Sequence, residues 1–486
     1  MAATATVPAH CLVVGTINAG RVGNETSPGA PVSRYTYTIN WQARLPDAWN
    51  SKFHMPGGGG TNGSVPGTTG RLRQGYAQAA NDSGHSNAVN SDPLAGGSAA
   101  FGTDYLARVD FAYNAIDVTT QNAKRLVEIY YGDRPAYSYF EGCSMGGREA
   151  MMVTQRLPSY FDGAADGMVS NSQACTTRRV KPKLDALTCA ADKTPACLAA
   201  DQIDAIVNIY DSGAPNSRGR PQYARWMWDA GIAGCTSPAD CNTPTATNIN
   251  IGWRLWNVGI FNPAFVPHVT PAPNGALSFA SLGGGAIPLL FATPPILPAP
   301  TANDGLANLI MNYDFDTFAA SIFGRNAAFP VSNTRLLNVD DTDLSPFKRG
   351  NGKLIIWQPQ SGGPFSPQDM VDWYEDMSRE MGGFEKTQDF ARLFMMPGVN
   401  HCGGGPGTST IDAFSPVVDW VENGNAPATI LGTAPANTPW PGRTRALCPY
   451  PAYAKYKGTG DLNLAESFEC HVDRRHGHDH HRGDDR

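Results

Sequence analysis

The chain has 486 residues, of which 41% are hydrophobic and 16% are charged, and its formal net charge is −6 at pH 7. These values are typical of a folded globular protein and exclude an intrinsically disordered one. The acidic balance, without a basic stripe, argues against nucleic acid or an anionic membrane surface as a partner.

The first third of the chain alternates predicted strands and helices. Residues 33–47 alternate apolar and polar side chains, which predicts a strand, and SKFHMPGGGG predicts a short strand that runs into a glycine loop. Apolar residues at helical spacing predict a helix over 106–131. The elements predicted next are the strand SYFEG, the helix GGREAMMVTQRLP and the strand FDGAADGMV. This order is typical of a parallel sheet with crossover helices.

The alternation stops between about residues 170 and 340, a stretch rich in Pro, Gly, Asn and Trp, and we interpret this stretch as an inserted lid. The alternation then returns with the strand GKLIIWQP, the helix QDMVDWYEDMSREMG, the strand RLFMMPG and the helix FSPVVDWVENG. We therefore predict a discontinuous catalytic domain, a lid domain and a His-rich tail, which we interpret as flexible and solvated rather than as a metal site. The catalytic domain comprises residues 1–170 and 341–471, the lid domain residues 171–340, and the tail residues 472–486.

The cysteines indicate the compartment. No apolar run has transmembrane length, and the start MAATATVPAHC has neither the basic nor the apolar part of a signal peptide. Pairs at close spacing are typical of small disulfide loops: Cys189 with Cys197, Cys235 with Cys241, and Cys448 with Cys470. Because disulfides form in oxidising compartments, we expect a secreted or periplasmic protein whose leader has been removed.

A candidate nucleophile lies in the stretch GCSMGG, which places Ser144 in a G-x-S-x-G motif between a predicted strand and a predicted helix. This is the setting of a nucleophile elbow, in which glycines permit a tight turn that projects the serine hydroxyl. The N-terminus of the next helix directs backbone N–H groups at the site, which favours developing negative charge. The alternative is a glycine-rich turn with an idle serine.

A serine hydroxyl needs a base to remove its proton, and His401 is the best candidate. It follows the predicted strand RLFMMPG and begins the glycine loop HCGGGPG. In an α/β-hydrolase the base comes last in chain order, on such a loop. We interpret His85, in NDSGH, as a residue that fastens a loop by a hydrogen bond.

A cysteine adjoins each of these two residues: Cys143 precedes Ser144, and Cys402 follows His401. If Ser144 and His401 meet, the two cysteines lie within bonding reach. Such a disulfide would fix the distance between nucleophile and base, and by loop-closure entropy it would contribute about 4–5 kcal/mol to stability. The alternative is two unrelated buried thiols.

Five motifs form a recognisable set: GCSMGGRE, NDSGH, YFDG, RLFMMPGVNHCGGGPG and RTRALCPYP. This set resembles the tannase/feruloyl esterase family, which includes mono(hydroxyethyl) terephthalate hydrolase-like esterases. The resemblance runs from about Cys11 to Cys470. It implies an α/β-hydrolase core with a lid, and serine-dependent hydrolysis of esters with an aromatic acid part through an acyl-enzyme, without a cofactor.

The resemblance also assigns site residues. It implies a disulfide between the cysteines beside the catalytic serine and histidine, and a C-terminal disulfide that corresponds to the pair Cys448 and Cys470. It places the oxyanion-hole donors at the backbone N–H groups of about Gly60 and of Met145.

The sequence departs from the family at the triad acid. The family usually has an aspartate in a pattern like HGxxDxxISP, whereas here Gly362 is at the aspartate position and Gln358 at the histidine position. Loss of the carboxylate that orients the imidazole can lower the rate by about 10⁴. Asp166 ends the strand after the nucleophile helix, where the family commonly has alanine, and strand ends of a parallel sheet share one edge. We hypothesise that Asp166 is the triad acid. One alternative is that Asp166 only caps a turn or binds backbone N–H groups. Another is that Asp369 is the triad acid, although we expect Asp369 to belong to a helix cap.

A second departure lies in the predicted lid, where the family often has a calcium loop of the type CDALDGxxDGxI. Here the stretch reads KLDALTCAADKTPAC, which keeps only Asp185. Calcium takes six to eight oxygen ligands, so we predict no metal at this position. The disulfides expected in the lid would stiffen it instead. Cys11 and Cys175 have no assigned partner and are either free or bonded to each other.

Three functions are compatible with the sequence. The first is a serine esterase in which Ser144 attacks the carbonyl of a small aromatic ester and His401 delivers the proton to the leaving alcohol. The second is an acyltransferase, or a hydrolase of an unusual bond, on the same fold. The third is a binding homologue impaired by the glycine at position 362. Aromatic residues of the lid could pack against an aryl acid or form a small core: Trp226, Trp228, Trp253, Trp256 and Phe261.

Overall fold

The fold is described from a computed structural model of the whole chain. The described residues are 1–4, 6–23, 35–89, 97–167, 176–190, 197–213, 216–229, 231–232, 286–296, 314 and 316–473.

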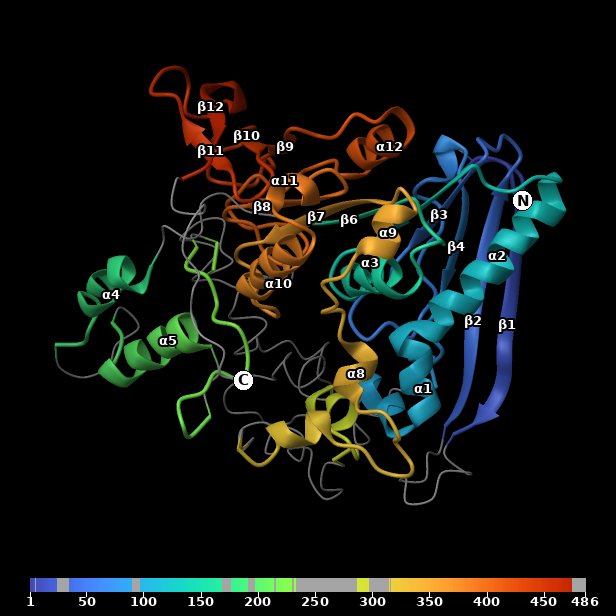
Figure 1. Cartoon of the computed structure of the whole chain (residues 1–486), viewed down its shortest axis with the longest axis horizontal. Coiled ribbons are helices and arrows are strands. Elements are labelled where there is room, and N and C mark those ends of the chain that lie inside the picture. The colour runs from blue at the N-terminus through green and yellow to red at the C-terminus, as the bar shows by residue number, and fades with distance from the viewer. Residues whose placement is uncertain are drawn as a thin grey trace.

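An eight-stranded sheet forms the centre of the described part of the chain, with the order β1-β2-β4-β3-β5-β6-β7-β8 (Figure 1). Its strands are β1 (His10–Val22), β2 (Thr36–Pro46), β3 (Lys52–Pro56), β4 (Ala77–Asn81), β5 (Tyr137–Glu141), β6 (Gly163–Gly167), β7 (Lys353–Pro359) and β8 (Ala391–Met396). Strand β2 pairs antiparallel with β1 and β4, and the strands from β4 to β8 pair in parallel. The predicted parallel sheet is therefore present, with an antiparallel extension at one edge.

Helices occur between and after the strands, and several of them cover the sheet. They are α1 (Tyr105–Val109), α2 (Ala115–Tyr131), α3 (Met145–Arg156), α4 (Thr177–Asp185), α5 (Ala200–Ser212), α8 (Asn333–Leu337), α9 (Ser345–Arg349), α10 (Pro367–Glu380), α11 (Phe384–Thr387) and α12 (Phe414–Asn423). The helix predicted over 106–131 is α1 and α2, joined by a π-helical turn at Asp110–Asn114. Helix α2 packs on β4, α3 on β5 and β6, and α12 on β6 and β7.

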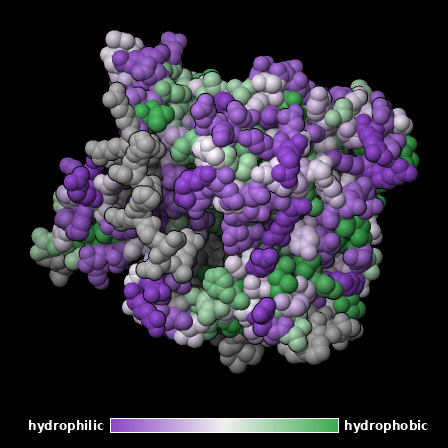
Figure 2. Space-filling view, viewed as in Figure 1, coloured by the Kyte–Doolittle hydropathy of each residue, from purple (hydrophilic) through white to green (hydrophobic). Residues whose placement is uncertain are grey.

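The main core lies between the parallel strands and these helices. Phe140 of β5, Ile355 of β7, Phe394 of β8 and Tyr374 of α10 are at most 1% exposed. Their burial explains why β7 and β8 contain the apolar runs LIIW and LFMM, since helices cover parallel strands on both faces. Hydrophilic side chains cover most of the face shown in Figure 2, and the apolar ones on it are scattered.

Strands β6 and β7 are neighbours in the sheet, with Gly163 opposite Lys353, although much of the chain lies between them. Residues 168–352 therefore leave the sheet after β6 and return at β7. We call them the inserted region. Figure 1 shows its helices α4 and α5 away from the sheet, beyond α10. No helix in the described ranges is both long and apolar enough to cross a membrane.

Two small hairpins follow α12 and were not predicted from the sequence. Strand β9 (Ile430–Thr433) pairs with β10 (Thr444–Leu447), and β11 (Tyr453–Tyr456) pairs with β12 (Phe468–His471). Strands of four residues carry too little periodicity to be recognised in a sequence.

Candidate active site

Ser144 lies at the sharp turn between β5 and α3. Its backbone has φ 60° and ψ −123°, a conformation that side chains rarely adopt and that is typical of a nucleophile elbow. A Cβ on Gly142 would come within 2.5 Å of the Gly146 carbonyl, and a Cβ on Gly146 would come within 2.9 Å of the Gly58 carbonyl oxygen. These close approaches explain why the turn needs glycine on both sides of the serine.

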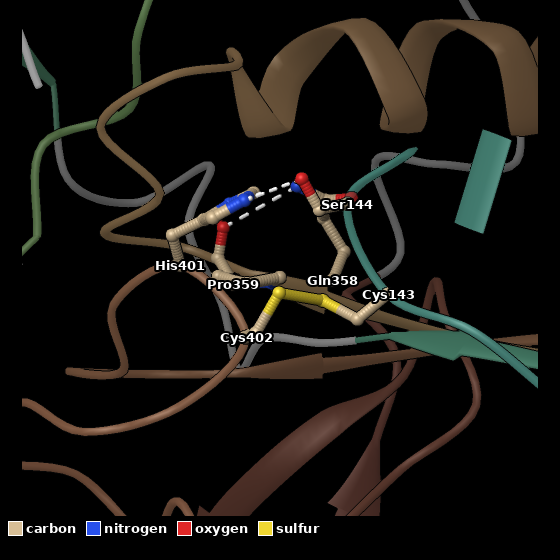
Figure 3. Close-up of a disulfide and its surroundings, with 6 residues drawn as sticks. All are labelled: Cys143, Ser144, Gln358, Pro359, His401 and Cys402. Atoms are coloured by element: carbon tan, nitrogen blue, oxygen red, sulfur yellow. Dashed lines mark hydrogen bonds between the residues drawn. A yellow bond between two sulfur atoms is a disulfide. The ribbon is translucent and has the colours of Figure 1, made fainter. Parts of the chain in front are cut away.

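His401 lies on the loop after β8 and meets the serine. Its Nε2 atom is 2.8 Å from Ser144 Oγ, which is hydrogen-bond distance (Figure 3). Burial lowers the pKa of His401 to about 4, so the imidazole is neutral at pH 7. A neutral imidazole that accepts a hydrogen bond at Nε2 can take the proton of the serine hydroxyl.

A disulfide joins the neighbours of these two residues. Cys143 and Cys402 are bonded, with 6.0 Å between their Cα atoms and a sequence separation of 259 (Figure 3). Cys402 has φ 61°, so the residues after both Cys143 and His401 have a positive φ. The bond ties the two turns that carry Ser144 and His401.

The other cysteines follow the predicted pairing where they are described. Cys189 is bonded to Cys197, and Cys448 to Cys470. Within the described part of the chain, Cys11 is a free cysteine. The remaining cysteines lie outside the described residues: Cys175, Cys235 and Cys241.

The glycine loop after β3 packs on the first turn of α3. The N–H of Gly57 donates to the Glu141 carbonyl at 2.9 Å, and the N–H of Gly58 donates to Oε2 of Glu149 at 2.8 Å. Glu149 is 2% exposed, and burial raises the pKa of its carboxyl group. Gly60 lies at the turn that ends this stretch, with φ 60°, and Met145 begins α3. Glu149 was not among the predicted site residues, although it lies three residues after the G-x-S-x-G motif.

His85, the other histidine considered in the sequence, is fully buried. Its ring stacks on Phe101 with 3.9 Å between the ring centroids. Burial lowers the pKa of His85 to about 3, so it is neutral and belongs to the packing of this region.

The candidate acids lie around the ends of β6 and β7. Asp166 belongs to β6, whose residues Ala165 and Gly167 pair with Ile355 and Trp357 of β7, but its side chain lies outside the described residues. Gln358, near the end of β7, extends its side chain toward the Ser144–His401 pair in Figure 3.

Asp369 lies in the first turn of α10, and the residue that caps this helix is Ser366, whose hydroxyl accepts from the N–H of Gln368 at 3.1 Å. Asp229 of the inserted region was not predicted as a site residue. Its carboxylate binds the loop that leads to His401, where it accepts a hydrogen bond from the N–H of Gly398 at 2.8 Å. No local motif marks Asp229.

The chain resembles known proteins in sequence and in fold. The family described as "Tannase and feruloyl esterase" matches residues 21–165 and 299–471. The chain is 35% identical to a mono(2-hydroxyethyl) terephthalate hydrolase of Piscinibacter sakaiensis over 96% of this chain and 86% of that protein. It is 28% identical to a probable feruloyl esterase of Arthroderma benhamiae over 88% of this chain and 81% of that protein.

Among solved structures, feruloyl esterase B from Aspergillus oryzae is similar, with a TM-score of 0.61 and 18% identity, over 95% of this chain and 96% of that chain. At this identity the likeness concerns the fold alone.

Proposed function

Because this chain belongs to the tannase and feruloyl esterase family, we propose that it is a serine-dependent carboxylic ester hydrolase that acts on small aromatic esters. The observation that carries the proposal is the 2.8 Å contact between Ser144 Oγ and His401 Nε2, beside a disulfide that joins their neighbours. The aromatic substrate class is supported by the relatives, whose names specify terephthalate and feruloyl esters.

In the proposed mechanism, His401 takes the proton of Ser144 as Oγ attacks the ester carbonyl. The tetrahedral intermediate collapses when the bond to the alcohol oxygen breaks, and the imidazolium gives its proton to the leaving alcohol. Water, deprotonated by the same imidazole, then attacks the acyl-enzyme, which releases the acid and restores the serine hydroxyl.

The oxyanion of each tetrahedral intermediate needs backbone donors. The N–H groups of Gly57 and Gly58 already bind Glu141 and Glu149, so a donor from this loop must follow them. We assign this role to the N–H groups of Gly60 and Met145, as the family resemblance implies. The N-terminal end of α3 supports the assignment because its dipole favours negative charge.

We assign the role of triad acid to Asp166. Its support is the position of β6 beside β7 in the parallel sheet, which brings the end of β6 to the edge that carries the loops of Ser144 and His401. A carboxylate there would hold the imidazole in the tautomer that accepts at Nε2.

Within the inserted region, we propose that residues 171–340, the lid predicted from the sequence, form a lid domain that shapes the substrate pocket. Its support is the path of residues 223–229, which bind the loop after β7 near His401. The catalytic domain would then comprise 1–170 and 341–471. Three disulfides among the described residues support a secreted or periplasmic location.

A panel of aryl esters tests the function. The wild-type protein should hydrolyse at least one of feruloyl, galloyl and terephthaloyl esters, and a fluorophosphonate probe should label it. Ser144→Ala should lose both hydrolysis and labelling, whereas Ser159→Ala, at an exposed turn after α3, should keep both. A wild-type protein that neither reacts with the probe nor hydrolyses any ester would be a binding homologue. Esters formed only when an alcohol acceptor is added would indicate acyl transfer.

A further inference from the structure

A stretch of the inserted region lies along the loop after β7, the loop in which glycine occupies the position of the family's acid. Trp226 donates through Nε1 to the Gly362 carbonyl at 3.3 Å. Ser366 binds the same stretch twice: its hydroxyl donates to the Arg225 carbonyl at 2.6 Å, and its N–H donates to the Tyr223 hydroxyl at 3.2 Å. Residues 223–226 therefore follow this loop from its C-terminal end toward Gly362.

The carboxylate of Asp229 comes next along this stretch and binds two loops at once. Its Oδ2 atom accepts a hydrogen bond from the hydroxyl of Ser361, beside Gly362, and another from the N–H of Gly398 at 2.8 Å. Ser361 also donates its N–H to the Val399 carbonyl at 3.1 Å. One carboxylate thus joins the loop after β7 to the start of the loop that ends at His401.

Asn400, directly before His401, makes a second connection. With its amide nitrogen facing the neighbouring carbonyls, Asn400 donates to the Gly231 carbonyl at 2.7 Å and to the Ser361 carbonyl at 3.3 Å. Asn400 and Val399 are fully buried. A Cβ on Gly231 would come within 2.8 Å of the Gly398 carbonyl, so the inserted region and the histidine loop are in backbone contact.

We propose that Asp229 is a positioning residue for His401: it holds residues 398–400 against the loop after β7 and thereby sets the distance between the imidazole and Ser144. Hydrogen bonds to a carboxylate are roughly twice as strong as neutral ones, which suits this task. The inserted region then contributes to the geometry of the catalytic pair, in a chain whose loop after β7 lacks the usual carboxylate. This inference rests on the proposed function of Ser144 and His401.

Asp229→Ala and Asp229→Asn test the proposal, with Asp211→Asn as a matched control in the same region, since Asp211 is exposed on α5. The measurements are kcat, KM, the rate of fluorophosphonate labelling and the melting temperature. A misplacement of about 1 Å can cost about 10²-fold in rate, so Asp229→Ala should lower kcat and the labelling rate by about 10²-fold. Because asparagine can still accept both hydrogen bonds, without the charge, Asp229→Asn should lose only about tenfold.

The split between kcat and KM separates positioning from mere attachment of the inserted region. If Asp229 only attaches that region, Asp229→Ala will raise KM and leave kcat and the labelling rate unchanged, which would overturn the proposal. A kcat within about twofold of wild type would overturn it as well. A wild-type protein without esterase activity or labelling would instead contradict the proposed function.

Ser361→Ala keeps the test decisive if Asp229→Ala does not fold. It removes one partner of the carboxylate and leaves the bond to Gly398, so kcat should fall by about threefold to tenfold. Unchanged kcat in both Ser361→Ala and Asp229→Asn would contradict the proposal.

Discussion

The sheet core and the inserted region are stabilised in different ways. The core is apolar: side chains such as Ile355 and Phe394 are fully buried against helices. The inserted region is attached to the core both by a second, smaller apolar cluster and by polar side chains that reach its backbone. Arg108 of α1, which is fully buried, donates to the carbonyls of Leu289 at 2.7 Å and Ala292 at 2.9 Å.

Helix α3, which begins after the nucleophile, also donates hydrogen bonds to backbone carbonyls near the end of the inserted region. Arg148 donates to the Leu337 carbonyl at 3.0 Å, and Arg156 to the Leu336 carbonyl at 2.9 Å. Bonds to backbone carbonyls depend on the path of the chain and not on its side chains. These attachments are therefore insensitive to the side chains at those positions of the inserted region.

The largest expected effect tests whether the sheet core supplies all the catalytic residues, including the triad acid. Asp166→Asn should lower kcat by about 10⁴-fold, because a triad without its carboxylate loses the orientation of the imidazole. Adding Gly362→Asp should recover part of this loss, since a Cβ at Gly362 would be 3.4 Å from its nearest neighbour, the Pro359 carbonyl oxygen. Steady-state kinetics measures both variants, with Asp133→Asn, at an exposed turn, as the control. Unchanged turnover in Asp166→Asn would show that the acid is elsewhere.

The second effect compares a disulfide at the active site with one at the periphery. Replacing Cys143 and Cys402 together by alanine should lower the free energy of unfolding by about 2–5 kcal/mol, as for other native disulfides. Replacing Cys448 and Cys470 should cost less, because their sequence separation is 22 and not 259. Denaturant unfolding gives both values. Only the replacement of Cys143 and Cys402 should also lower kcat. An equal loss of unfolding free energy and of kcat in the two double variants would refute this distinction.

The third effect concerns the attachment of the inserted region. Arg108→Met should lower the free energy of unfolding by about 3 kcal/mol, because it leaves the buried carbonyls of Leu289 and Ala292 without their donor. Arg125→Met is the control: its side chain is 66% exposed and pairs with Glu128 at the surface, so it should cost less than about 1 kcal/mol. Thermal or denaturant unfolding measures both variants. A similar loss of unfolding free energy in Arg108→Met and Arg125→Met would contradict this prediction.

The smallest effect is the pH dependence of the reaction at Ser144 and His401. Burial lowers the pKa of His401 to about 4, so the base form persists at lower pH than in an ordinary histidine. At pH 5 about nine tenths of the imidazole should be neutral, against about 3% for a pKa of 6.5. The acid limb of kcat/KM should therefore have its midpoint near pH 4, measured by product chromatography after a check that activity returns at pH 7. A midpoint near 6.5 would mean that the imidazole is not desolvated in the working enzyme.

The strands differ in how readily the sequence revealed them. Strands β7 and β8 were predicted because they contain apolar runs, LIIW and LFMM, which helices cover. The edge strand β1 was missed because many of its residues are exposed, including Val14 at 70%. Strand β4, with the sequence AQAAN, was missed because small side chains give little periodicity.

The sequence by itself determined the nucleophile, the base and the disulfide beside them, because each depends on a local motif: glycines around Ser144, a glycine loop after His401, and a cysteine next to each. Only the tertiary structure decided what supports them. Glu149 binds the glycine loop, and Asp229 binds the loop of His401, through contacts between segments far apart in the chain. A hydrogen bond between distant segments leaves no pattern in either one, since any residue with an acceptor at that point in space can make it.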